Sequence, residues 1–417
     1  MQTRPFNLVE AVRARAASIG FGLVGQGLNF AAMLLPILLG RLDQVAFLVT
    51  VSAVAGVAAY AFTWSYASVY PGIARASEAA IGTVTSACLL LLGTLLMLAA
   101  AFLPQLPLAA RAITLWASAL TLPLGLNLMA TALFVRDRNY AGIAQLRLVS
   151  GLSNLLFVLV ACLGPTEYQP LLAIPTALSL AVTAAWGLFR NWPEIRTQIG
   201  PASMRTAAMW AHMRAYSQAM AAALLGGAAF QLVGIATPLM GTVAHGWAVA
   251  VRFAGGFSTV SQQVLAPMFE VDFAHHLREG KAGPAAASQR RAYRLGLAYA
   301  VLCAPVVCAI IVIVNGDGDV HGIERTLLLL GAAVFTFAIL STSLIPRNLV
   351  IAGGQRLFLG WALAKVALGA AALATLSGAP LLFALAMIEA AFQLAYVAAA
   401  TLQVARSGSA VPEGGPA

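Results

Sequence analysis

Uninterrupted apolar stretches of about 20 residues recur along the whole chain, separated by short polar segments. A helix of that length crosses a hydrocarbon core about 30 Å thick. The stretches are continuous and do not alternate with polar positions, which favours helices over the strands of a membrane barrel. The pattern therefore predicts an all-α polytopic membrane protein. Its transmembrane helices, about 12 in number, are expected at 16–40, 44–70, 80–103, 112–134, 142–163, 168–189, 215–237, 243–269, 293–315, 326–346, 357–378 and 380–404.

Similar residues recur at equivalent points of the first six and the last six spans. "TWSYASVYP" (63–71) and "TVSQQVLAP" (259–267) share Thr, Ser and Pro, and "PILLG" (36–40) resembles "PLMG" (238–241). These matches favour two pseudo-symmetric six-helix bundles around a central cavity, as in a two-lobed transporter. Glycines near Gly226 and Gly255 also predict kinks or broken helices in the second half. The expected division is an N-terminal lobe over 1–190, a cytoplasmic linker over 191–214, a C-terminal lobe over 215–404 and a disordered cytoplasmic tail over 405–417.

The charge of the chain is sparse and unevenly placed. Only 9% of its residues are charged, against about 25% in soluble proteins. If the N-terminus is cytoplasmic, most of the 24 Lys and Arg residues fall in cytoplasmic segments, and only Arg41, Arg111 and Arg325 fall on the opposite side. This positive-inside pattern predicts that both termini are cytoplasmic. The net charge of +10 is thus a topology signal, and no nucleic-acid partner is expected.

Residues suited to catalysis are rare in the loops. The acidic and His residues that come closest to a metal cluster, Asp317, Asp319, His321 and Glu324, are better explained as a solvated turn. No phosphate-binding G-x-x-x-x-G-K-[ST] sequence occurs, which argues against ATP-driven pumping by this chain alone. The four cysteines lie within apolar runs and have no metal or redox spacing, so core packing is expected. We therefore predict no catalytic site, no metal site and no enzyme activity.

Arg252 lies in the apolar segment "GWAVAVRFAGGFSTVSQQVLAP" (246–267). It is the only Asp, Glu, Lys or Arg between Ala215 and Phe269. It is about nine residues into its span, or ~14 Å deep, which is close to the bilayer midplane. A charge there is costly and commonly functional. Either it pairs with a carboxylate or carbonyls and braces helices, or it holds an anion in a wet cavity, next to polar residues such as Ser261 and Gln262.

Other polar residues inside the spans allow two roles each. Lys365 and Glu389 lie at nearly equal depths in antiparallel spans, so an ion pair is expected that either braces the helices or titrates and couples transport to protons. Arg147 is about six residues into its span and either snorkels to the cytoplasmic surface or meets the substrate. Gln26 and Asn29 share one helical face and are expected to make interhelical hydrogen bonds or to line the cavity.

The residues that begin each half resemble a known family. "PLMG" followed by "GWAVAVRFAGGFSTVSQQVLAPMFE" looks like the start of the second lobe in the multidrug/oligosaccharidyl-lipid/polysaccharide exporter superfamily. An A-x-R-[LF] element there precedes a small-residue helix that ends in proline. "LNFAAMLLPILLGRLDQVAFLVTVSA" resembles the start of the first lobe, and "IAGGQRLFLGWAL" (351–363) resembles the loop before the eleventh span. The chain is most similar to the polysaccharide-flippase branch.

The resemblance implies a secondary transporter that flips an undecaprenyl-diphosphate-linked oligosaccharide from the cytoplasmic to the periplasmic leaflet of the bacterial inner membrane, for O-antigen or exopolysaccharide synthesis. The implied partners are this lipid-linked substrate, the bilayer, a polysaccharide polymerase and glycosyltransferases. No cofactor is expected, and H+ and Na+ are the candidate coupling ions. Arg252 would then grip the diphosphate with its planar fork of donors. The candidate substrate-binding residues are Arg252, Arg147, Lys365, Gln26, Asn29, Ser261 and Gln262, and Glu389 is the candidate ion-coupling residue.

Three other classes of protein share some of these features. A drug or cation exporter of the same superfamily would have the same fold but an acidic cavity, whereas these spans hold more cations than anions. A major-facilitator sugar transporter would carry G-x-x-x-D-x-x-G-R-[RK] after its second span, which "YPGIARASEAA" does not match. A membrane glycosyltransferase or ligase would have a large periplasmic loop with catalytic charges, and the expected loops are short.

Overall fold

The computed structural model describes residues 16–70, 73, 75–137, 139–201, 203–315 and 320–409. Within these ranges every regular element is a helix and no strand occurs. The described residues form two compact units, 16–238 and 239–409, called here the N-terminal unit and the C-terminal unit.

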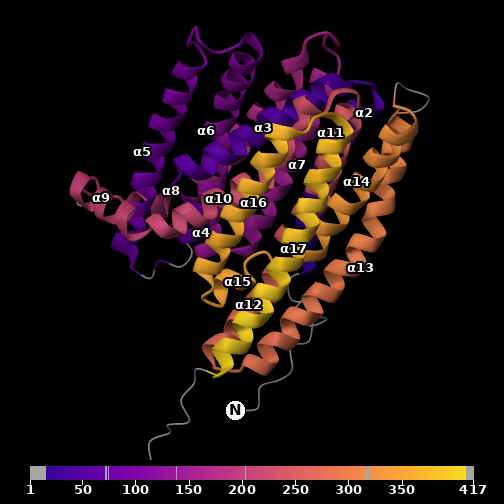
Figure 1. The fold of residues 1–417 in the computed structure, drawn as a ribbon. Helices are drawn as coiled ribbons and strands as arrows, with labels where there is room; N and C mark the ends of the chain where they lie inside the picture. Colours follow the sequence, from indigo (N-terminus) through magenta and orange to yellow (C-terminus); the bar gives the residue numbers. More distant parts are fainter. Residues whose placement is uncertain are drawn as a thin grey trace, which may run out of the picture. The chain divides into compact units, whose positions relative to one another are not determined.

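The N-terminal unit consists of long apolar helices and three short elements (Figure 1). Its elements are α2 (Ala16–Leu38), α3 (Leu42–Phe62), α4 (Tyr66–Val69), α5 (Ala76–Ala100), α6 (Leu108–Arg136), α7 (Tyr140–Ala161), η2 (Gln169–Leu172), α8 (Ala173–Gln198), α9 (Thr206–Ala215) and α10 (Ser217–Ile235). The 3-10 segment η3 (Thr237–Val243) then leads into the C-terminal unit.

The C-terminal unit contains one helix that changes its winding part of the way along. Its elements are α11 (Ala244–Val260), the π-helical η4 (Ser261–Leu265), α12 (Ala266–Arg278), α13 (Ala282–Asn315), α14 (Gly322–Thr342), α15 (Asn348–Ile351), α16 (Gln355–Thr375) and α17 (Gly378–Ser409). α14 packs against both α11 and α17, and α16 packs against α17.

Eleven segments of the described chain are long and apolar enough to cross a membrane. All but one coincide with a single expected span. The exception, Met220–Val260, runs through α10 and α11 and therefore overlaps both expected spans 215–237 and 243–269. The predicted fold class, an all-α polytopic membrane protein, is confirmed.

The predicted breaks near Gly226 and Gly255 do not fall at these two glycines. α10 and α11 run through them, while a kink lies at Gly241 in the 3-10 segment η3 between the two helices, and the winding changes again at the π-helical η4. A glycine permits a break but does not force one, whereas a π turn requires a local change of hydrogen-bond register. The expected second span also ends early, because Trp64 and Ser65 adopt left-handed backbone angles, with φ of 50° and 54°.

The segments between the sixth and seventh and between the eighth and ninth expected spans are largely helical. α8 extends to Gln198 and α9 fills much of the expected linker, while α12 and α13 leave only a short turn between them. α17 continues to Ser409, so the first residues of the expected disordered tail are helical. Residues 410–417 lie outside the described residues.

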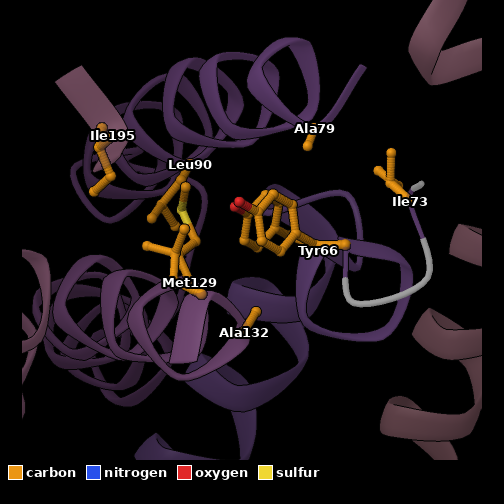
Figure 2. Packing of buried hydrophobic residues seen from close by; sticks show 9 residues of the cluster. Tyr66, Ile73, Ala79, Leu90, Met129, Ala132 and Ile195 are labelled. Carbon is orange, nitrogen blue, oxygen red and sulfur yellow. The ribbon is translucent and has the colours of Figure 1, made fainter. Parts of the chain in front are cut away.

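Two features of packing position polar groups in the N-terminal unit. α2 and α7 cross closely where glycines replace side chains. A Cβ at Gly151 would collide with the carbonyl of Gly25, and a Cβ at Gly25 would lie 2.5 Å from the carbonyl carbon of Arg147. A buried cluster joins α4, α5, α6 and α8 and includes Tyr66 and Leu90 (Figure 2). This cluster holds the end of α4 against the long helices.

Candidate functional site

The helix α11 presents Arg252 from an otherwise apolar segment. Trp247 anchors the buried face of α11 on Phe335 of α14, with ring centroids 5.0 Å apart. Arg252 itself is only partly exposed, and its Nε is buried without a hydrogen-bond partner. No ion pair joins Arg252 to a carboxylate in the described part of the chain. Among the described residues its charge therefore has no carboxylate as a counter-ion.

Small residues leave space beside Arg252. Gly255 and Thr259 follow it at three and seven positions on α11, which places them on nearly the same face. Apart from its two chain neighbours and the nearby backbone of α11 itself, no described atom lies within 4 Å of the position that a Cβ on Gly255 would occupy. The Thr259 hydroxyl donates to the Gly255 carbonyl at 2.8 Å. This face of α11 thus combines a cation with open space.

The expected polar residues after α11 lie in the π segment η4. Ser261 is fully buried and donates to the Ser258 carbonyl at 2.9 Å. Gln262 is exposed, and its Nε2 donates to the Ser258 hydroxyl at 2.9 Å. Single π turns inside helices occur frequently at functional sites. Of the two residues, Gln262 retains an amide oxygen for a ligand, whereas Ser261 is occupied within the helix.

Lys365 and Glu389 form a buried ion pair between α16 and α17. Lys365 Nζ lies 2.7 Å from Glu389 Oε2, and the two side chains are 3% and 1% exposed. Lys365 Nζ also makes a cation–π contact with the indole ring of Trp361, whose centroid is 5.1 Å away. The ion pair expected from their matching depths is present.

A hydrogen-bonded chain continues from this pair to α14. Gln393 Nε2 donates to Glu389 Oε1 at 2.7 Å, and the hydroxyl of Thr342 donates to Gln393 Oε1 at 2.8 Å. Both carboxylate oxygens of Glu389 are therefore occupied. Sequence reasoning missed Gln393 and Thr342. The i, i+4 spacing of Glu389 and Gln393 was a usable signal, but nothing in the sequence connects Thr342 to them.

The remaining predicted residues lie in the N-terminal unit. Asn154 Nδ2 donates to Asn29 Oδ1 at 2.9 Å, so Asn29 makes an interhelical hydrogen bond from α2 to α7. Gln26 is buried on the same helix. Arg147 is partly exposed, its Nε is buried without a hydrogen-bond partner, and it forms no ion pair with a described carboxylate.

Metal-binding side chains do not gather within the described ranges. No group of three or more His, Cys, Asp or Glu residues there has the geometry to hold a metal ion. His275 lies 3.3 Å from Glu279, whose other oxygen binds Lys281 at 2.8 Å, and all three are on the surface. Asp317 and Asp319 lie outside the described residues.

Similar proteins are found by structure. No protein-family model matches the chain, and no curated protein is similar to it in sequence. The fold is similar to a multidrug resistance MATE family transporter of the MOP superfamily in its inward-facing conformation, with a TM-score of 0.59, 14% identity, and 94% of this chain and 96% of that chain covered.

Two further solved structures have the same fold. A MOP superfamily transporter from Pyrococcus furiosus, described as having a binding pocket of reverse polarity that suggests a different function, gives a TM-score of 0.57 and 11% identity over 95% of this chain and 96% of that one. The Vibrio cholerae MATE transporter VcmN in its bent form gives 0.54 and 18% identity over 94% of each chain. At these identities the likeness concerns the fold: almost the whole chain has the architecture of MATE transporters of the MOP superfamily.

Proposed function

We propose that this protein is a secondary transporter that flips an undecaprenyl-diphosphate-linked oligosaccharide from the cytoplasmic to the periplasmic leaflet of a bacterial inner membrane. The proposal rests on the position and charge of Arg252. It is a permanent cation near the middle of a span, without a carboxylate partner among the described residues and next to open space at Gly255. Such a group is suited to an anionic substrate.

A diphosphate is the kind of anion that most needs this group. Moving a bare anion through about 30 Å of hydrocarbon costs many kcal/mol, and a fixed cation in a wet cavity lowers that barrier. Arginine stays charged at every relevant pH, and its planar fork can contact two phosphate oxygens at once. Gln262 and Thr259, on the same continuous helix, offer polar atoms to a sugar. Arg147 on α7 is the candidate for first contact with the headgroup.

The main alternative is a drug or cation exporter with the same fold, which would need an acidic site. Glu389 is the carboxylate that lies deep inside a span, and Lys365 neutralises it at 2.7 Å. These spans therefore offer little negative charge to a cationic drug. For an anion they offer the positive charge of Arg252, which has no ion-pair partner among the described residues. The Pyrococcus furiosus transporter, with its pocket of reverse polarity, is a precedent for pockets of different polarity in this fold. A membrane glycosyltransferase or ligase is disfavoured further by the lack of a catalytic cluster in the sequence.

The ion pair of Lys365 and Glu389 is the proposed coupling element. Protonation of Glu389 would remove the negative charge from the pair and leave Lys365 uncompensated, which favours a different packing of α16 against α17. Gln393 and Thr342 would transmit that change to α14, which contacts α11. H+ is the favoured coupling ion and Na+ is the second candidate. No organic cofactor is needed for this mechanism.

A reconstituted assay tests the substrate class. The purified protein is placed in vesicles that contain a fluorescent polyprenyl-diphosphate disaccharide, and a membrane-impermeant reductant bleaches the molecules in the outer leaflet. We expect bleaching beyond the half that empty vesicles show, and no uptake of a cationic dye under a pH or Na+ gradient. Dye transport together with an unflipped disaccharide would support the exporter instead. In cells, the glycosyltransferases would supply the substrate and the polymerase would consume it.

A further inference from the structure

The short helix α9 lies close to the membrane surface by chain connectivity. The preceding span ends at Thr197, and the following span begins at Met220, only about five residues after α9 ends. Five extended residues reach at most about 18 Å. In Figure 1, α9 lies beside the lower part of α5 and crosses it at an angle. α9 is thus kept near the bilayer interface at one end of the N-terminal unit.

One face of α9 is fixed to the N-terminal unit by specific contacts. His212 is buried at 9% exposure, and its Cε1 would lie 3.0 Å from a Cβ placed on Gly82 of α5. The Tyr216 hydroxyl, one residue past α9, donates to Glu78 Oε1 at 2.7 Å. That hydrogen bond raises the pKa of Tyr216 to about 12, so the hydroxyl remains a donor. These contacts define which face of α9 is turned away from the protein.

A strained turn supplies a further contact to α9. Trp64 has a left-handed φ of 50°, and the amides of Trp64 and Ser65 donate to the carbonyls of Ala61 and Tyr60, which is the glycine-type cap of a helix end. Tryptophan is unfavourable at this position. Its indole N–H donates to the carbonyl of Met213 at 3.2 Å. The residue that occupies the strained position therefore also holds α9 in place.

The outer face of α9 is both basic and aromatic. Trp210, 66% exposed, and the exposed Arg214 are four positions apart and so share one side of α9, while Met204, 62% exposed, and the exposed Arg205 lie immediately before the helix begins. The sequence contains no Asp or Glu from Ile195 to Phe269, so no acidic residue of this segment neutralises the arginines. Tryptophan favours the headgroup region of a bilayer, and arginines beside it attract anionic lipids.

We propose that α9 is an interfacial helix whose outer face binds the headgroups of anionic phospholipids. The membrane is the occupant because the chain holds α9 at its surface, and the charge of the face selects the anionic lipids. Trp210 and Met204 would enter the headgroup region while Arg205 and Arg214 contact phosphates. This lipid contact is independent of the transported substrate.

The emission of Trp210 reports this interaction directly. The chain has seven tryptophans, and the difference between the spectra of the wild type and of Trp210→Phe isolates Trp210. Brominated phosphatidylglycerol or brominated phosphatidylcholine is titrated into full-length protein in phosphatidylcholine nanodiscs. We expect the anionic lipid to quench Trp210 at a lower mole fraction. Each of the two arginines near the surface contributes about fivefold, so the preference of the wild type is roughly 25-fold.

The paired variant Arg205→Gln with Arg214→Gln is expected to remove that preference while Trp210 is still quenched by both lipids. Arg290→Gln with Arg294→Gln removes two exposed arginines from α13 and is expected to leave the preference unchanged. Equal quenching of the wild type by both lipids would overturn the selection of anionic lipid. Quenching by neither lipid would overturn the interfacial placement of α9.

Discussion

The charged residues inside the spans differ in whether they have a partner. Lys365 and Glu389 are joined at 2.7 Å and almost fully buried, whereas Arg252 has no ion pair within the described ranges. Removing one member of a buried pair leaves an uncompensated charge and costs about 3–5 kcal/mol. Removing Arg252 strands no carboxylate within the described part of the chain. Stability and transport should therefore respond differently at the two places.

Glu389→Gln separates bracing from coupling. Because Lys365 loses its counter-charge, we expect the free energy of unfolding to fall by about 3–5 kcal/mol, and the added change Lys365→Met to restore most of it. If Glu389 also carries a proton, transport stays lost in the double variant. Thermal unfolding in detergent and flipping in vesicles measure the two effects. Recovery of transport together with stability would leave only a bracing role.

The sequence predicts charged contacts only where depth or spacing connects the residues. Lys365 and Glu389 could be paired from their positions in consecutive spans. Asn29 could be assigned an interhelical hydrogen bond, but its partner Asn154 could not be chosen among the polar residues of other helices. Thr342 was not predictable, because its contact with Gln393 depends on how α14 packs against α17.

At the scale of elements, helices follow the apolar runs while their interruptions follow local backbone geometry. α10 and α11 run through Gly226 and Gly255, and the change of winding occurs at Ser261–Leu265, two residues before Pro267, which has no backbone N–H to donate to the carbonyl four residues earlier. α3 ends at a left-handed Trp64, a conformation that costs about 1–2 kcal/mol outside glycine. Since tertiary contacts stabilise that turn, composition alone could not reveal it.

The docking of α9 is expected to depend on pH through His212. Burial lowers the pKa of His212, and the neighbouring Glu78 opposes the shift only in part. The docked state therefore disfavours the proton. Docking is complete above the ordinary His pKa of about 6.5 and weakens as the pH falls through it. Hydrogen exchange of residues 206–215, corrected for intrinsic rates, should be faster near pH 5 than near pH 8.

His212→Phe is the control for this prediction. It keeps a ring against Gly82 and Tyr216 but cannot take up a proton. Exchange in α9 of this variant should be independent of pH after the same correction. Equal protection of wild-type α9 at both pH values would contradict the role of His212.

At the scale of the whole molecule, the apolar pattern predicted the fold class, but not the contact that α10 makes with α3. α10 packs on α3 within the N-terminal unit, where the Thr50 hydroxyl donates to the Gly234 carbonyl at 3.4 Å. Hydrophobicity could not indicate this, because both faces of an apolar helix look alike in sequence. The division into lobes at 191–214 stays a prediction.

The membrane orientation can be tested with two single cysteines in a background without the four natural ones. Glu167→Cys and Lys281→Cys place these cysteines in exposed turns that are predicted to lie on opposite sides of the membrane. Because the basic residues predict cytoplasmic termini, a membrane-impermeant maleimide should label Glu167→Cys in intact spheroplasts and Lys281→Cys only after permeabilisation. The reverse labelling pattern would contradict the predicted orientation.

The central claim, that Arg252 binds the diphosphate of the substrate, is tested most directly by flipping rates of Arg252→Ala and Arg252→Lys at matched membrane abundance. Losing a charge-assisted contact is worth about 1.5–3 kcal/mol, or about ten- to a hundredfold in affinity. We expect Arg252→Ala to be inactive, and Arg252→Lys to keep partial activity because it retains charge without the fork. Both proteins should fold normally. Wild-type flipping by a well-expressed Arg252→Ala protein would contradict the account.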